Sequence, residues 1–376
     1  MKEEILKTRA FLDKLGSVME KSAAPRNLEL LPPKELHIEL TYRCTADCLM
    51  CDLKHLKTVQ RGEEISLKEI KKSVEEAASL KDLDFIVLSG GEPWLREDLS
   101  GIVRFFKKRY PAAKILILSN LMDTELALSK IKEIEKISGL GNLCIGTSID
   151  GIGAVHDRIR GRKGAFESLN ATAAVLRTKY PSLFPVFNMT LLPENSDQLF
   201  EVYRWAQEHG IAVSSQVMVQ KKSTKKFRWG GEHVKNIDED INRIISDIYK
   251  RRKVKKFSRD FFWNNLDVVF FLLGLHYTVK YISSPRRFFP NCPCGEKFAM
   301  LSPGGDLYFC PVHKDRAAGN LREKSFDDIW NGKEACGIRS FLNLRSCHCW
   351  LSCTKSVMMA AAFFPGKDRI IKALGE

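Results

Sequence analysis

The first 219 residues alternate between short apolar runs and segments with helical spacing. Strand-helix alternation with near-continuous apolar strands is typical of a parallel sheet covered by helices on both faces, so the pattern predicts an α/β fold. Six such units fit either a doubly wound sheet or an incomplete barrel. The predicted strands are residues 35–41, 84–89, 114–119, 143–149, 184–192 and 211–219.

Two of the predicted helices have recognisable ends. Ser66 and Glu69 have the spacing of a capping box, and the apolar residues from Leu67 onward follow helical periodicity. A second helix begins near Leu199 and is expected to end before Gly210, because glycine commonly terminates helices.

The alternation stops near residue 221. Isoleucines at helical spacing predict an amphipathic helix through 237–248, and an aromatic run follows at 257–277. Asp267 and two asparagines interrupt that run, so we do not expect it to span a bilayer. A cysteine-rich tail begins at Asn291.

Composition supports a folded chain, because 376 residues with 44% hydrophobic content can bury a sizeable core. The N-terminus mixes acids and bases and lacks the apolar core of a secretory signal, so we expect a cytoplasmic location. Eleven cysteines in a reducing compartment argue against a disulfide framework. Their grouping at 44–51 and 292–353 argues for metal binding instead.

Positive charge is concentrated in one segment. Residues 221–290 contain 17 lysines and arginines against 7 acids, in a chain whose formal net charge is +14. A solvated basic surface around an aromatic core is one interpretation, and an anionic membrane surface or a phosphate-bearing partner is the other. Nucleic acid is not expected, because no recognised nucleic-acid module accompanies the charge.

Three cysteines, Cys44, Cys48 and Cys51, lie within "TYRCTADCLMCDLK" directly after the first predicted strand. Three thiols cannot close a tetrahedral structural zinc site unaided, and no histidine lies at zinc-finger spacing. In an iron-sulfur cube, three thiolates leave one iron without a protein ligand. That arrangement suits a cluster that binds and reduces a substrate or cofactor.

The C-x3-C-x2-C loop after a first strand resembles the radical SAM superfamily, and "SGGEP" after the second strand strengthens the resemblance. The resemblance implies a 4Fe-4S cluster on these three cysteines that binds S-adenosylmethionine. It also implies cofactor contacts at strand ends, from Gly90, Gly91, Glu92, Ser119, Asn120, Ser148 and Asp150. The segment "SIDGIGAVHDRIRGRKGAF" also resembles superfamily members that carry a SPASM or twitch domain. Its His156 and Arg160 belong to that resemblance, and their alternative role is to fix a loop.

The tail resembles the SPASM or twitch domain that follows the barrel in part of this superfamily. Cys294, Gly305 and Cys310 match its opening, "AGNLREKSFDDIWNG" matches its linker, and no cysteine follows Cys353. The resemblance therefore implies one auxiliary 4Fe-4S cluster, whose expected ligands are Cys294, Cys310, Cys349 and Cys353, with Cys292 and Cys347 in reserve. A zinc knuckle is the alternative, and Cys144 and Cys336 are expected to be small buried residues.

The resemblance implies a partial (β/α)6 TIM-like barrel followed by a small cysteine-rich auxiliary-cluster domain. We expect four parts: an N-terminal helical extension at 1–34, the barrel at 35–220, a basic and aromatic connecting segment at 221–290, and the SPASM-like domain at 291–376. Only 34 residues precede the first strand, which is short for a leader-peptide-binding module and argues against ribosomal peptide substrates.

The implied activity is reductive cleavage of S-adenosylmethionine to a 5′-deoxyadenosyl radical, which abstracts a hydrogen atom from a sugar, cyclitol, lipid-linked or peptide substrate. An external one-electron reductant such as flavodoxin or ferredoxin is expected. The alternatives are a ribosomal-peptide maturase and a non-catalytic iron-sulfur electron carrier or scaffold. Peripheral membrane attachment is an alternative to a purely cytoplasmic location.

Overall fold

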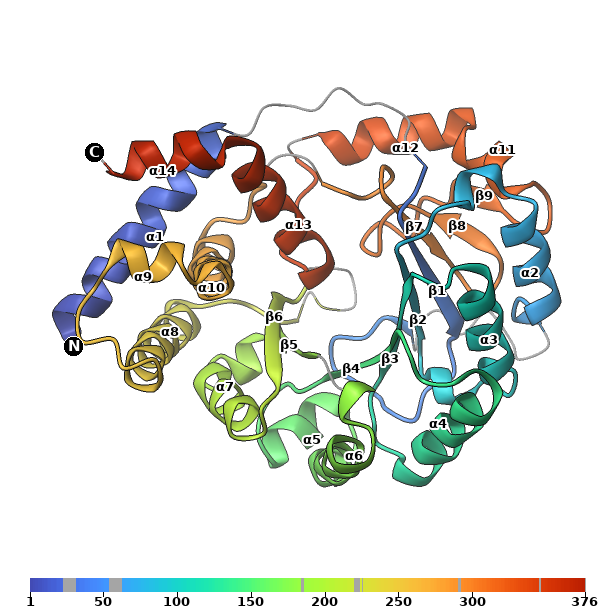
Figure 1. Cartoon of the computed structure of the whole chain (residues 1–376), viewed down its shortest axis with the longest axis horizontal. Helices are drawn as coiled ribbons and strands as arrows, with labels where there is room; N and C mark the ends of the chain where they lie inside the picture. Colours follow the sequence, from blue (N-terminus) through green and yellow to red (C-terminus); the bar gives the residue numbers. More distant parts are fainter. Residues whose placement is uncertain are drawn as a thin grey trace.

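The computed structural model of the chain describes residues 1–22, 32–53, 63–183, 186–219, 224, 226–289, 292–344 and 346–375. Its described residues form a nine-stranded sheet in the order β6-β5-β4-β3-β2-β1-β7-β8-β9 (Figure 1). Six strands pair in parallel in chain order: β1 (Glu35–Thr41), β2 (Phe85–Gly90), β3 (Lys114–Ser119), β4 (Leu143–Ser148), β5 (Val186–Leu191) and β6 (Ala212–Val217).

These six strands confirm the predicted α/β fold, with ends within a residue or two of the predicted ones. The first two residues of the run 184–192 lie outside the described residues. β6 and β9 are the two ends of the sheet, so the barrel is partial and not closed. The tail extends this sheet: β7 (Phe298–Leu301) pairs in parallel with β1, and β8 (Asp306–Tyr308) and β9 (Gly319–Asn320) follow antiparallel.

Helices connect the six parallel strands on the outside of the curved sheet (Figure 1). The capping box of Ser66 and Glu69 is present at the start of the first of them. They are α2 (Leu67–Glu75), α3 (Leu99–Arg109), α4 (Thr124–Ser138), α5 (Ala154–Arg160), α6 (Ala165–Lys179) and α7 (Leu199–Glu208), with 3₁₀ turns η3 (Ala78–Leu80), η4 (Pro93–Leu95), η5 (Pro181–Leu183) and η6 (Pro193–Asn195).

A helical layer lies beyond β6 and joins the two ends of the chain (Figure 1). It comprises α1 (Lys2–Ser22), α8 (Gly231–Arg251), α9 (Arg259–Trp263), α10 (Leu266–Ser283), α13 (Ser352–Phe363), the turn η7 (Phe364–Gly366) and α14 (Lys367–Gly375). Near the other end of the sheet lie α11 (Phe326–Trp330) and α12 (Lys333–Asn343).

Within the described part of the chain, α10 alone is long and apolar enough to cross a membrane by length and composition, and 56% of it is buried inside the molecule. It packs against α1, α8, α13 and β6, as a core helix does. The neighbouring basic side chains Arg251, Arg252, Lys255 and Lys256 are exposed. This is the arrangement of a basic surface beside an aromatic core, and contact with an anionic membrane stays a prediction.

The contact between α1 and α10 leaves no room for a side chain at Gly16. A Cβ atom there would lie 2.2 Å from the hydroxyl oxygen of Tyr277. Tyr277 is fully buried, and its hydroxyl donates to Glu20 Oε1 at 2.7 Å, so the ring is held in place. The helix therefore accepts the conformational cost of a glycine in order to seat this ring.

Replacing Gly16 by Ala should destabilise the protein by about 1–3 kcal/mol, because overpacking outweighs the gain in helix propensity. Gly337→Ala in α12 is the matched control, since no atom lies within 4 Å of its Cβ position. The control should raise stability by roughly 0.5–1 kcal/mol. Thermal unfolding of both variants measures the difference, and equal midpoints for Gly16→Ala and wild type would contradict the packing argument.

Candidate active site and auxiliary cysteine centre

The end of β2 is pressed against the backbone that leads into the first cysteine loop. The Gly91 N–H donates to the Thr41 carbonyl at 2.7 Å, and the Glu92 N–H donates to the Arg43 carbonyl at 2.8 Å. A Cβ atom would lie 2.3 Å from the Thr41 oxygen at Gly90 and 2.1 Å from the Arg43 oxygen at Gly91. Gly90 also has φ +115°, which favours glycine. The two glycines thus allow β2 to fix the start of the loop.

Polar groups from other strands reach the sulfur atoms of this loop. Asn120 Nδ2 lies 3.7 Å from Cys44 Sγ, and Arg160 Nη1 lies 3.6 Å from Cys48 Sγ. The Cys44 side chain is exposed, yet partial desolvation of its thiol raises the pKa to about 11, and a bound metal would lower that pKa. Amide and guanidinium donors directed at sulfur suit thiolate ligands. The donor set of the loop fits an iron-sulfur cluster.

The C-terminal end of α5 braces the same loop. The Leu49 N–H donates to the Ile159 carbonyl at 2.8 Å, and the Asp47 N–H donates to the Arg160 carbonyl at 3.0 Å. Gly161 follows, and a Cβ atom there would lie 2.3 Å from the Asp47 carbonyl oxygen. The loop is therefore held on one side by β2 and on the other by α5.

Asp150 is fully buried and binds Arg160, with 2.5 Å between its Oδ2 and Arg160 Nη2. Its Oδ1 accepts from the Thr190 N–H at 2.8 Å, and its own N–H donates to His156 Nδ1 at 3.1 Å. Burial lowers the pKa of His156 to about 3, which keeps this ring neutral and able to accept. Burial raises the pKa of Asp150, and Arg160 opposes that rise. In this structure His156 and Arg160 fix the loop and its neighbouring strand.

The predicted residues after β2 and β3 contact one another. Glu92 is 2% exposed, and its Oε2 accepts from the Asn120 N–H at 2.9 Å. Ser119 Oγ accepts from the indole N–H of Trp94 at 2.7 Å. Burial raises the pKa of Glu92 to about 7. These contacts bring Glu92, Ser119 and Asn120 together beside Cys44.

Ser148 ends β4 and is paired in register with Asn188 of β5. The Asn188 Oδ1 atom is buried and has no hydrogen-bond partner among the described residues. An acceptor of this kind, beside a predicted cofactor contact, is a candidate ligand contact that the sequence analysis missed. The available signal was a polar residue inside the apolar run "VFNMTLL".

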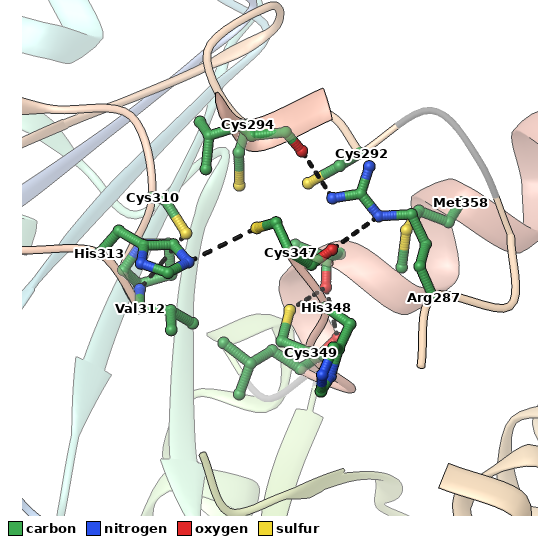
Figure 2. A pocket seen from close by; sticks show the side chains of 14 residues that line it. Arg287, Cys292, Cys294, Cys310, Val312, His313, Cys347, His348, Cys349 and Met358 are labelled. Carbon is green, nitrogen blue, oxygen red and sulfur yellow. Dashed lines mark hydrogen bonds between the residues drawn. The ribbon is translucent and has the colours of Figure 1, made fainter. Parts of the chain in front are cut away.

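Five of the C-terminal cysteines gather around one small cavity (Figure 2). Arg287 Nε donates to the Cys347 carbonyl at 2.9 Å, and His313 Nε2 lies 3.5 Å from Cys347 Sγ. Cys353 lines a neighbouring cavity of about 180 Å³ together with Cys294 and Glu35. The cysteines of the first cavity are Cys292, Cys294, Cys310, Cys347 and Cys349.

Both reserve cysteines, Cys292 and Cys347, thus line the same cavity as three of the four expected ligands. The choice among them stays a prediction. Within the described ranges, no three His, Cys, Asp or Glu side chains are placed to hold a single metal ion. A tetrahedral zinc site would bring its sulfur atoms to within about 4 Å of one another. The thiols of Cys292 and Cys310 both hydrogen-bond to the Cys294 thiol, so these three sulfur atoms are close together at the cavity.

The expectation for Cys336 was wrong, because its side chain is exposed. The face of α12 that packs inward carries Ala335, Arg339 and Leu342, and helical periodicity places Cys336 beside that face. Cys144 on β4 is half-buried.

A cavity of about 200 Å³ is lined by sequence neighbours of both cysteine groups. Met50, which precedes Cys51, lines it from one side, and Pro311, which follows Cys310, lines it from the other. The carboxyl ends of β5 and β6 supply most of the remaining wall, with Thr190, Gln216, Val217, Met218 and Val219, and Val312 and Leu351 complete it.

Comparison with known proteins agrees with this geometry. Residues 38–218 match the model of the radical SAM superfamily, and residues 292–354 match that of the SPASM iron-sulfur cluster-binding domain. An Fe-coproporphyrin III synthase of Methanosarcina barkeri is 33% identical over 77% of this chain and 72% of its own length. An AdoMet-dependent heme synthase of the same organism is 28% identical over 80% of this chain and 83% of its own length.

Among solved structures, Streptococcus suis SuiB bound to its precursor peptide SuiA has a similar fold, with a TM-score of 0.56 and 15% identity over 85% of this chain and 70% of SuiB. The superfamily uses a 4Fe-4S cluster with S-adenosylmethionine, and the SPASM domain adds auxiliary iron-sulfur chemistry. This chain belongs to the radical SAM superfamily and is an S-adenosylmethionine-dependent enzyme with a C-terminal SPASM domain.

Proposed function

We propose that Cys44, Cys48 and Cys51 hold the cluster that binds S-adenosylmethionine, and that the C-terminal cysteines hold one auxiliary 4Fe-4S cluster. When bound, these groups supply one-electron cleavage of S-adenosylmethionine and a 5′-deoxyadenosyl radical that removes a hydrogen atom from the substrate. The observation that carries the proposal is the cavity lined by Met50, which precedes Cys51, and by Pro311, which follows Cys310. Because each cysteine group has a sequence neighbour in this wall, we propose that a substrate binds in this cavity.

The protein's own contribution is position and exclusion of water. Asn120 and Arg160 donate toward the sulfur atoms of Cys44 and Cys48, as donors around metal-bound sulfur commonly do. The Glu92 carboxylate holds Asn120 in place by accepting from the Asn120 backbone N–H. We retain Gly90, Gly91, Ser119, Ser148 and Asp150 as proposed cofactor contacts and add Asn188, whose buried oxygen lacks a protein partner among the described residues.

The cavity limits what part of a substrate reacts. Its volume of about 200 Å³ accommodates one substituent or side chain, with the rest of a large substrate outside. The wall combines apolar side chains with Thr190 and Gln216, whose side chains hydrogen-bond to each other at 3.0 Å. Lys221 and Lys222 follow this wall in the sequence and lie outside the described residues.

We propose a carboxylate-bearing tetrapyrrole as the first substrate class, because two relatives are named for synthesis of heme and Fe-coproporphyrin III and the chain after Val219 is basic. A peptide side chain meets the same size limit and is the second candidate. Flavodoxin or ferredoxin remains the proposed external reductant. The family assignment favours an enzyme over the electron-carrier alternative.

Replacing Cys44, Cys48 or Cys51 by Ala should reduce 5′-deoxyadenosine formation to background, because each supplies one of three thiolates to the cluster. The assay is anaerobic incubation of reconstituted enzyme with dithionite and S-adenosylmethionine. Cys144→Ala is the control and should retain activity. Undiminished product in a first-loop variant would refute the ligand assignment. Stimulation of wild type by Fe-coproporphyrin III, compared with a test peptide, separates the two substrate classes.

The triple variant Cys44→Ala, Cys48→Ala, Cys51→Ala should retain about four irons per chain, the content of one auxiliary cube. Iron and zinc analysis after anaerobic reconstitution provides the measurement. Roughly eight irons would mean two auxiliary clusters and would contradict the proposal of a single auxiliary cluster. Bound zinc in place of iron would support the alternative that the C-terminal cysteines form a zinc knuckle.

A further inference from the structure

A second large cavity lies between β6, α10 and α13, which are neighbours in Figure 1, and no cysteine is among its described lining residues. Its volume is about 400 Å³, within the range of small-molecule sites. Its share of β6 is Ala212 to Ser215, the start of the strand. The proposed substrate cavity uses Gln216 to Val219 at the other end. The two cavities are therefore distinct.

The wall of this second cavity is mostly apolar, and α10 and α13 supply much of it. Phe364 lines it and is 55% exposed, so an apolar ring is accessible from solvent there. Asp267 also lines it but is exposed and lies 3.7 Å from Arg252, which offsets its charge. Aliphatic and aromatic side chains supply most of the remaining surface, namely Val213, Leu266, Phe270, Phe271, Leu275 and Met359.

The cavity contains one buried amine, Lys355 of α13, which is 5% exposed. Burial lowers the pKa of this amine to about 7, and a bound acid beside it would favour the charged form. Its ammonium group donates to the Ser215 carbonyl, the one hydrogen bond recorded for it among the described residues. An ammonium group carries three N–H donors. The facing position on α10 is Gly274, and a Cβ atom there would lie 3.9 Å from Lys355 Nζ. The absence of a side chain at Gly274 keeps the amine open toward the cavity.

A second polar group beside Lys355 also lacks a partner. Ser215 lines the cavity, and its hydroxyl oxygen is buried without a hydrogen bond in the described structure. A buried amine and a buried hydroxyl with unused donors are costly unless something accepts from them. An anionic oxygen group would accept from both.

We propose that this cavity binds a monocarboxylic acid with an apolar chain. The carboxylate accepts hydrogen bonds from Lys355 and Ser215, and the chain lies along the apolar faces of α10 and α13. Lys355 supplies the charge that selects an acid over an alcohol, and the aromatic side chains supply the hydrophobic part of the affinity. This site is additional to the proposed function and does not depend on it.

Isothermal titration of the reconstituted full-length enzyme with decanoate and with decanol tests the proposal. Wild type should bind decanoate about tenfold more tightly than decanol, the difference expected from one charge-assisted hydrogen bond. Lys355→Met should abolish that preference while keeping decanol binding. Lys136→Met, an exposed lysine on α4, is the control and should behave as wild type.

Ala360→Phe provides an independent variant, because Ala360 lines the cavity from α13 and a phenyl ring would fill it. It should weaken decanoate and decanol alike, with an unchanged thermal unfolding midpoint as evidence of folding. The proposal is overturned if wild type shows no saturable decanoate binding, if it binds both compounds equally, or if a folded Ala360→Phe or Lys355→Met variant binds decanoate as wild type does.

Discussion

The close backbone contact between the end of β2 and the start of the first cysteine loop is the constraint on which the site depends. Gly90 and Gly91 lie so near the carbonyls of Thr41 and Arg43 that any side chain at either position would push the loop away. This contact sets where the loop leaves β1. It also places Glu92 where its carboxylate can hold Asn120 beside Cys44. One steric requirement thus positions the cysteines and a neighbouring polar group together.

Local sequence patterns predicted the parts of the fold that local physics determines. The β-rich runs and the capping box at Ser66 correspond closely to observed elements, because alternation and capping depend on nearby residues. The pairing of β7 with β1 was not predictable, since a four-residue strand carries no register information across more than 250 residues. Likewise, only the three-dimensional arrangement shows that α5 braces the cysteine loop through Arg160.

The candidate site shows the same division. Spacing and family resemblance identified the cysteine groups, but burial decides what each neighbouring residue can do. Asp150 was expected to contact the cofactor, and its side chain is fully buried against Arg160 and the Thr190 N–H. Asn188 carried no motif, yet its oxygen is buried without a partner among the described residues. Burial thus shows which protein groups each side chain already contacts, and which buried acceptors have no protein partner among the described residues.

α13 connects features that are far apart in the sequence. Its first residue, Ser352, donates to Gln216 Oε1 at 3.0 Å, and Gln216 lines the proposed substrate cavity. Cys353 is the next residue, and Lys355 faces the second cavity two residues later. One turn of helix therefore carries contacts to the substrate cavity, a candidate ligand of the auxiliary cluster and the buried amine. Because these residues share one helical turn, the position of α13 fixes Ser352, Cys353 and Lys355 relative to one another.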